Sequence, residues 1–140
     1  MRILVSACLL GVCCRYDGQS KTCPAVMELM KEHELIPVCP EQLGGLPTPR
    51  PPAEIQGKRV VNCEGKDVTA QYEKGADEAA RLYQLFHCDC AILKARSPSC
   101  GVGMVYDGFF SGTLVSGDGI TAQALKRLGV RVMTEETLDE

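Results

Sequence analysis

The stretch AILKARSPSCGVG, residues 91–103, reads as a buried strand that runs into a tight loop carrying one cysteine. Residues 91–93 form a short apolar run, which is typical of a strand covered on both faces. Pro98 and Gly101 then break the pattern, because proline fixes its own backbone and glycine permits conformations that other residues avoid. The thiol of Cys100 therefore stands at the end of a strand, among hydroxyls and glycines, where a ligand or a nucleophile is expected. Structural cysteines more often sit inside the apolar run itself.

The same arrangement occurs twice more along the chain. The apolar run 2–7 leads into Cys8, the run 35–38 leads into Cys39, and a loop with glycine follows each cysteine. In an open parallel sheet the carboxyl ends of all strands lie along one edge, and ligands bind there, in the crevice where the strand order reverses. The sequence therefore predicts that Cys8, Cys39 and Cys100 converge at one edge of a parallel sheet.

Helical patterns separate these strands. The first begins at Pro24, in the position where helices accept proline, and ends between residues 31 and 34. Helical spacing of apolar residues predicts a second helix from residue 67 or 69 to about residue 86, and a third over about residues 120–128, before a last strand at 130–133. This alternation predicts a single α/β domain over residues 1–140, with a Rossmann-like open, mostly parallel sheet and helices on both faces.

Three irregular or exposed segments complete the chain. Residues 40–55 are rich in proline, with Gly44-Gly45, so we expect neither a helix nor a central strand there. A loop of that length inside a compact domain is usually functional. In this segment Glu41 is a candidate acid or base, with a helix-end or surface carboxylate as the alternative, and Arg50 is a candidate substrate clamp. Residues 58–63 predict a short exposed strand, and residues 105–113 a hairpin or flap.

The overall composition excludes several classes of function. The chain has 140 residues, 45% of them hydrophobic, and a formal net charge of −3. There is no global charge that would favour nucleic acid or membranes, and no apolar run approaches the roughly 20 residues needed to cross a bilayer. The N-terminal apolar run is followed at once by polar and basic residues, so it predicts a first strand and not a signal peptide. We expect a cytoplasmic protein.

The nine cysteines point to metal or thiol chemistry. An odd number at irregular spacing argues against a disulfide framework, and no Cys-x-x-Cys pair is present. A structural zinc site would need a fourth ligand, such as Cys14 or water. A catalytic thiol would need a nearby base. The two histidines, His33 and His87, are expected at helix ends on the far side of the sheet from the cysteine loops, which argues against Cys–His catalysis. An iron–sulfur cluster is usually held by four cysteines, and three would leave one iron open.

Several motifs together resemble the TudS-type thiouracil desulfidases. They are SACLLG at 6–11, CRYDG at 14–18, PVCPE at 37–41, GGLPTPR at 44–50 and KARSPSCG at 94–101. The resemblance covers nearly the whole chain and is carried by specific motifs. Longer relatives carry an additional C-terminal domain, so the resemblance implies the short, single-domain form.

The resemblance implies a [4Fe-4S] cluster on Cys8, Cys39 and Cys100, with the fourth iron free for the sulfur of the substrate. It implies removal of sulfur from thiolated uracils such as thiouracil or 4-thiouridine monophosphate. It also leaves open whether Cys13 or Cys14 replaces or supplements Cys8. Positions expected to assist catalysis fall on Glu41 and Ser99.

Substrate binding is the expected role of a further set of residues. Cationic side chains suit a substrate phosphate, arginine above all because it offers two parallel donors. The candidates are Arg15, Lys21, Arg50, Arg96 and Ser97. Solvated loop cations are the alternative for Arg15 and Lys21.

Two other classes of function use the same cysteines. A non-enzymatic metal or iron–sulfur sensor would bind a cluster without turning over thiolated pyrimidines. A zinc-stabilised binding module would be colourless and hold stoichiometric zinc. The proline-rich loop and Glu41 beside Cys39 favour the enzyme.

Overall fold

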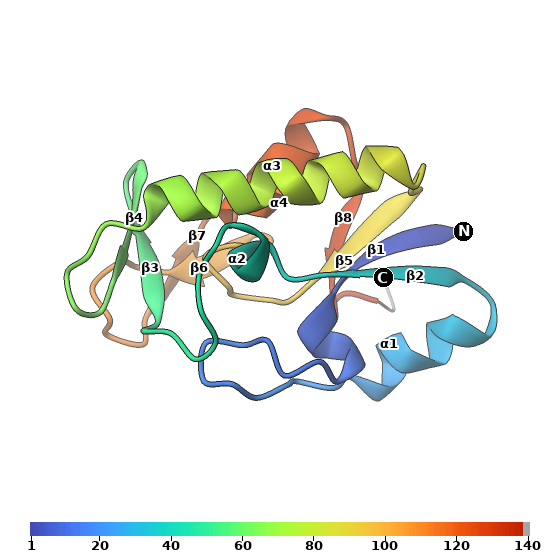
Figure 1. Cartoon of the computed structure of the whole chain (residues 1–140), viewed down its shortest axis with the longest axis horizontal. Helices are drawn as coiled ribbons and strands as arrows, with labels where there is room; N and C mark the ends of the chain where they lie inside the picture. The colour runs from blue at the N-terminus through green and yellow to red at the C-terminus, as the bar shows by residue number, and fades with distance from the viewer. Residues whose placement is uncertain (139–140) are drawn as a thin grey trace.

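Four parallel strands form the central sheet of this computed structural model, which describes residues 1–138 (Figure 1). They are β1 (Arg2–Ser6), β2 (Glu34–Val38), β5 (Cys90–Leu93) and β8 (Val132–Thr134), in the order β2-β1-β5-β8. The chain passes from β1 to β2 on one side and then crosses to β5 on the other, so the strand order reverses between β1 and β5. The predicted open parallel sheet is confirmed.

Helices cover both faces of this sheet, as the sequence predicted. One face carries the short helices η1 (Ala7–Leu10) and α1 (Pro24–Glu28), the latter continued by η2 (Leu29–Lys31). The other face carries α3 (Thr69–Leu85) and α4 (Ile120–Arg127), which pack against each other.

Alternating side chains of the central strands divide the core between the two faces. Ile3 and Val5 of β1 join Val26 of α1 in one buried cluster. Leu4, between them, joins Leu125 of α4 in the other. This division follows from the two-residue period of a strand, since successive side chains point to opposite faces.

Two small antiparallel hairpins lie beyond the carboxyl ends of the central strands, at the left of Figure 1. One is formed by β3 (Ala53–Gln56) and β4 (Arg59–Asn62), the other by β6 (Met104–Tyr106) and β7 (Leu114–Ser116). They correspond to the exposed strand predicted at 58–63 and the hairpin predicted at 105–113. Within residues 1–138, no helix is long and apolar enough to cross a membrane.

The prediction of no helix over residues 40–55 is wrong at its start. Residues Pro40–Leu43 form the short helix α2, with Pro40 in the first turn. Proline is tolerated there because the first backbone N–H groups of a helix have no partner inside it. At the other end of the segment, β3 begins at Ala53 and, within residues 1–138, pairs only with β4, so the expectation of no central strand holds.

Helix α2 contacts α3 backbone to backbone, through glycine on both sides. A Cβ built on Gly44 would lie 1.9 Å from the carbonyl oxygen of Gln71, and one on Gly75 would lie 1.9 Å from that of Pro40. No side chain fits at either position without moving a helix. This contact fixes where α2, and the residues it carries, stand relative to α3.

We expect Gly75→Ala to destabilise the protein by about 2 kcal/mol, because the added methyl group forces the two helices apart. The measurement is the free energy of unfolding from urea denaturation. Glu78→Ala, an exposed position on the same helix, is the matched control and should change stability by less than about 0.5 kcal/mol. Equal stabilities of Gly75→Ala and the wild type would show that the two helices do not depend on this close contact.

Candidate active site

A cavity of about 530 Å³ opens at the carboxyl edge of the sheet, where the strand order reverses. Cys8 reaches it from η1 directly after β1, Cys39 from the end of β2, and Cys100 from the loop after β5. The structure therefore brings the three strand-end cysteines together on the wall of one cavity. Cys8 and Cys100 are buried and Cys39 is partly buried.

A fourth thiol, Cys14, also lines this cavity. The thiol of Cys39 donates to the backbone oxygen of Cys14 over 3.6 Å. The pKa of Cys14 responds to two neighbouring thiols: Cys39 lowers it, and Cys8 and burial raise it by more, to about 11. Cys14 therefore lies at the same cavity wall as Cys8, beside Cys39.

The environment favours the protonated form of Cys14, Cys39 and Cys100 when no metal is bound. Burial, the largest cause, raises the pKa of Cys100 to about 12. The neighbouring Cys14 thiol, followed by burial, raises the pKa of Cys39. A metal must therefore displace protons when these thiols coordinate it, as thiol ligands generally require.

The donor set fits an iron–sulfur cluster better than a single metal ion. Within residues 1–138, no three His, Cys, Asp or Glu side chains converge closely enough to hold one ion. In a cubane cluster each cysteine sulfur binds a different iron, so its ligands stand farther apart and surround the cluster. Thiols that face one cavity from three separate strand ends match that requirement.

The remaining cysteines and both histidines lie elsewhere among the described residues. Cys13 and Cys63 are exposed, Cys23 is partly buried just before α1, and Cys88 and Cys90 are buried near the start of β5. Within residues 1–138, none of these five lines the cavity. His33 and His87 fall just before β2 and just after α3, at the opposite edge of the sheet from Cys100, as expected.

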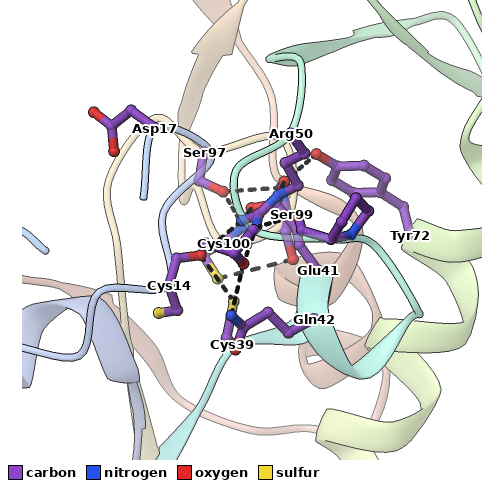
Figure 2. A network of polar contacts seen from close by, with 12 residues as sticks. Cys14, Asp17, Cys39, Glu41, Gln42, Arg50, Tyr72, Ser97, Ser99 and Cys100 are labelled. Atoms are coloured by element: carbon purple, nitrogen blue, oxygen red, sulfur yellow. Dashed lines mark hydrogen bonds and ion pairs between the residues drawn. The ribbon is translucent and has the colours of Figure 1, made fainter. Parts of the chain in front are cut away.

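Glu41, in the first turn of α2, lines the cavity and is held from two sides (Figure 2). Tyr72 of α3 donates its hydroxyl to Oε1 of Glu41. Arg50 approaches the same carboxylate with Nε 3.4 Å from Oε1 and Nη2 3.3 Å from Oε2. The Glu41 side chain remains 18% exposed, so one carboxylate is both fixed in orientation and accessible from the cavity.

Tyr72 is a permanent hydrogen-bond donor in this arrangement. Its ring is buried with Ala53, Val60 and Val68 in a small core beneath the β3–β4 hairpin. Burial, the largest cause, and the Glu41 carboxylate both raise the pKa of Tyr72, so the phenol keeps its proton.

Arg50 is engaged within the protein. Besides Glu41, its guanidinium donates to the backbone oxygens of Pro47 (3.2 Å) and Cys14 (2.9 Å) and to Oγ1 of Thr48 (3.1 Å). Its side chain is only 3% exposed. Arg50 thus ties the Cys14 loop to the carboxylate of Glu41, and few of its donors remain for a substrate phosphate.

The other predicted cations surround the cavity. Arg15 lies 3.6 Å from Asp17 and stacks over the ring of Tyr16, while Arg96 pairs with Glu136 over 2.7 Å. Within residues 1–138, Lys21 forms no ion pair. Lys21 is therefore the predicted cation that is most available to an anionic group.

The two predicted serines occupy different places in the Cys100 loop. Ser97 lines the cavity, and its Oγ accepts the backbone N–H groups of Ser99 and Cys100, each over 3.1 Å. Ser99 is 1% exposed and lies behind the cavity wall, with its Oγ 2.9 Å from that of Thr121 and 3.9 Å from the Cys100 sulfur. Ser97 therefore stabilises the turn of the loop through its two backbone hydrogen bonds, and Ser99 contacts the Cys100 sulfur from the side away from the cavity.

Sequence reasoning missed several residues of the site. Tyr72 occupies a core-facing position of a long helix, so its pattern predicted only packing. Ser6, which also lines the cavity, accepts the backbone N–H of Lys94 and joins the ends of β1 and β5. The signal for Ser6 was its place at the end of the first strand, two residues before Cys8.

Comparison with known proteins agrees with this geometry. A family model described as 2-thiouracil desulfurase matches residues 3–137. A solved structure described as the [4Fe-4S]-dependent thiouracil desulfidase TudS superposes with a TM-score of 0.93 at 47% identity, covering 98% of this chain and 92% of that one. The uncharacterized protein YbbK of Bacillus subtilis (strain 168) is 40% identical, over 99% of this chain and 98% of its own. The extent of these matches, together with the three strand-end cysteines and the fold, confirms the resemblance found in the sequence: the chain belongs to the 2-thiouracil desulfurase family.

Proposed function

We propose that this protein is a [4Fe-4S]-dependent desulfidase that removes sulfur from thiolated uracil bases or nucleotides and releases it as sulfide. The observation that carries this proposal is one cavity lined by Cys8, Cys39, Cys100 and the carboxylate of Glu41, in a chain of this family. The overall reaction is a hydrolysis, in which water supplies the oxygen of the product carbonyl and two protons leave with the sulfide.

Cys8, Cys39 and Cys100 are the proposed ligands of the cluster. When bound, a cluster with three protein ligands supplies one open iron, a Lewis acid with affinity for the soft sulfur of a thiocarbonyl group. Cys14 lines the same cavity and is the alternative to Cys8, whereas the exposed Cys13 lies outside the cavity wall.

Glu41 is the proposed general base. Its carboxylate would accept a proton from the water that attacks the carbon bearing sulfur. Tyr72 and Arg50 hold that carboxylate in one orientation, so that its accessible part faces the cavity. Within residues 1–138, Ser99 is not among the residues that line the cavity. We therefore propose that Ser99 assists catalysis indirectly, by holding the Cys100 loop in place.

Cations and Ser97 at the cavity are proposed to bind a substrate phosphate when the substrate is a nucleotide. Lys21 is the first candidate because it is unpaired within residues 1–138, and Arg15 and Arg96 line the same cavity. For Arg50 we propose support of Glu41 in place of phosphate binding, since its donors already have partners.

Three wider expectations accompany this function. All nine cysteines are free thiols, which favours a reducing compartment, and we propose a cytoplasmic location. We propose a small-molecule substrate and no binding to nucleic-acid duplexes. We also treat residues 1–140 as one catalytic domain.

The experiment that tests the function is purification without oxygen, followed by metal analysis and an activity assay. We expect about four iron and four sulfide per chain, as a cubane cluster requires, and release of sulfide from 2-thiouracil or 4-thiouridine monophosphate. A loaded cluster without turnover would favour a sensor. Colourless protein with stoichiometric zinc, and no cluster after anaerobic reconstitution, would favour a binding module.

Tyr72→Phe tests the support of Glu41 separately. The variant keeps the buried ring and loses only the hydroxyl that donates to the carboxylate, so we expect kcat for 2-thiouracil to fall about tenfold with KM nearly unchanged. Tyr83→Phe, on the same helix but outside the cavity, is the matched control and should retain wild-type kcat. Equal kcat values for Tyr72→Phe and the wild type would remove Tyr72 from the positioning of Glu41.

A further inference from the structure

One aromatic residue at the cavity has a backbone conformation that is unfavourable for its type. Phe110, in the turn between β6 and β7, has φ of +55°. Residues other than glycine rarely adopt this left-handed backbone conformation, and such outliers concentrate at functional sites. Gly108 and Gly112 supply positive φ in the same turn without strain. A phenylalanine therefore stands where glycine would relieve strain, which points to a use for its ring.

The neighbouring hairpin holds Phe110 in this conformation. Oε1 of Glu54, on β3, accepts the backbone N–H groups of Gly108 (3.0 Å) and Phe110 (3.2 Å). The side-chain amide of Gln56 donates to the backbone oxygen of Gly108 over 2.8 Å. A Cβ on Gly108 would lie 2.5 Å from the carbonyl oxygen of Ile55, so the turn is seated directly on β3. The position of Phe110 is thus set from outside its own hairpin.

The ring of Phe110 is placed for contact with a bound molecule. Phe110 lines the cavity that also holds the three cysteines, yet it remains 39% exposed. Phe109, next to it, is 81% exposed and does not line the cavity within residues 1–138. The chain has only seven aromatic residues, and three of them, Tyr16, Tyr106 and Phe110, line this one cavity. Such a concentration suits a flat, uncharged ring, because stacking requires a π face and no matching charge.

We propose that Phe110 is the surface against which the pyrimidine ring of the thiolated substrate packs, and that Glu54 is the positioning residue that holds Phe110 there. This inference rests on the proposed function, which supplies the pyrimidine. It assigns recognition of the ring to the β6–β7 hairpin. The cysteines and Glu41 line the part of the cavity formed by the strand ends and α2.

The test compares ring binding and turnover in variants of the cluster-loaded enzyme. In Phe110→Ala we expect the Kd for uracil, a ring without a reactive sulfur, and the KM for 2-thiouracil each to rise about tenfold. Phe110→Tyr keeps an aromatic face and should remain within about twofold of wild type. Glu54→Ala should reproduce the rise, whereas Glu54→Gln, whose side-chain oxygen can still accept both N–H groups, should not. Iron content is measured in every variant so that cluster loading is compared as well.

Phe109→Ala is the matched control, since it removes an adjacent and more exposed ring outside the cavity. Its Kd for uracil and its iron content should equal those of the wild type. The inference is overturned if Phe110→Ala binds uracil like the wild type, or if Phe109→Ala weakens binding as much as Phe110→Ala. Failure of the proposed function is a separate result: the loaded wild type would release no sulfide from any thiolated pyrimidine, whatever the uracil titration shows.

Discussion

Replacing Glu41 by glutamine is expected to slow turnover by orders of magnitude and to leave the cluster in place. Glutamine has nearly the same shape and still offers an oxygen to the Tyr72 hydroxyl, but it cannot take a proton from water. General-base catalysis contributes about 10²–10⁴-fold to a rate, so we expect kcat for 2-thiouracil to fall by about that factor. Sulfide release by the wild type and by Glu41→Gln, at equal iron content, is the measurement.

The structure also sets the control for this variant. Arg50 loses its ion pair with residue 41 but keeps its bonds to Pro47, Thr48 and Cys14, so the site should remain folded. Glu64→Gln, an exposed carboxylate outside the cavity, should retain full activity. Full activity in Glu41→Gln would remove this residue from the mechanism, and loss of iron along with activity would make its role structural.

Replacing Cys100 by alanine is expected to abolish both cofactor binding and activity. Cys100 is buried at the cavity wall, and two protein ligands are too few for a cluster that needs at least three. Iron after anaerobic reconstitution should fall from about four per chain to near zero, with loss of the visible absorption of the cluster. Sulfide release should fall to background.

Three further cysteine variants complete the test of the proposed ligand set. Cys63→Ala removes an exposed thiol outside the cavity and should bind a full cluster. Cys14→Ala separates the alternatives at the N-terminal loop: a full cluster in Cys14→Ala together with an empty site in Cys8→Ala would assign the ligand to Cys8. A full, active cluster in Cys100→Ala would refute the proposed ligand set.

The fold was predictable because its signals are local. Each central strand is a short apolar run bounded by turn residues, and the long helix α3 keeps its apolar spacing over several turns. The strand-end position of Cys8, Cys39 and Cys100 could be converted into convergence because a parallel sheet has one carboxyl edge. The same reasoning missed α2. The many prolines of residues 40–55 argued against a helix there, although the first turn of a helix accepts a proline, as it does at Pro40.

The partners within the site could not be predicted, because they depend on how distant segments dock. Tyr72 reads as core in its own helix, and only the docking of α2 onto α3 brings its hydroxyl to Glu41. Arg50 reads as a free cation in a proline-rich loop, and only the folded loop shows that its guanidinium is satisfied by Glu41 and by carbonyl groups. Glu54 and Phe110 lie far apart in the sequence on two different hairpins.

The paired glycines at 44 and 75 make the site sensitive to changes far from any reacting atom. Helix α2 begins right after Cys39, carries Glu41, and rests on α3 with no side chain as a spacer. A methyl group at this contact would shift the proposed ligand and the proposed base together, away from the thiols held by the other two strands. A misplacement of about 1 Å can cost about a hundredfold in rate. Screens for inactive variants should therefore recover enzymes that fold and keep every active-site side chain, with the defect in the spacing of two helices.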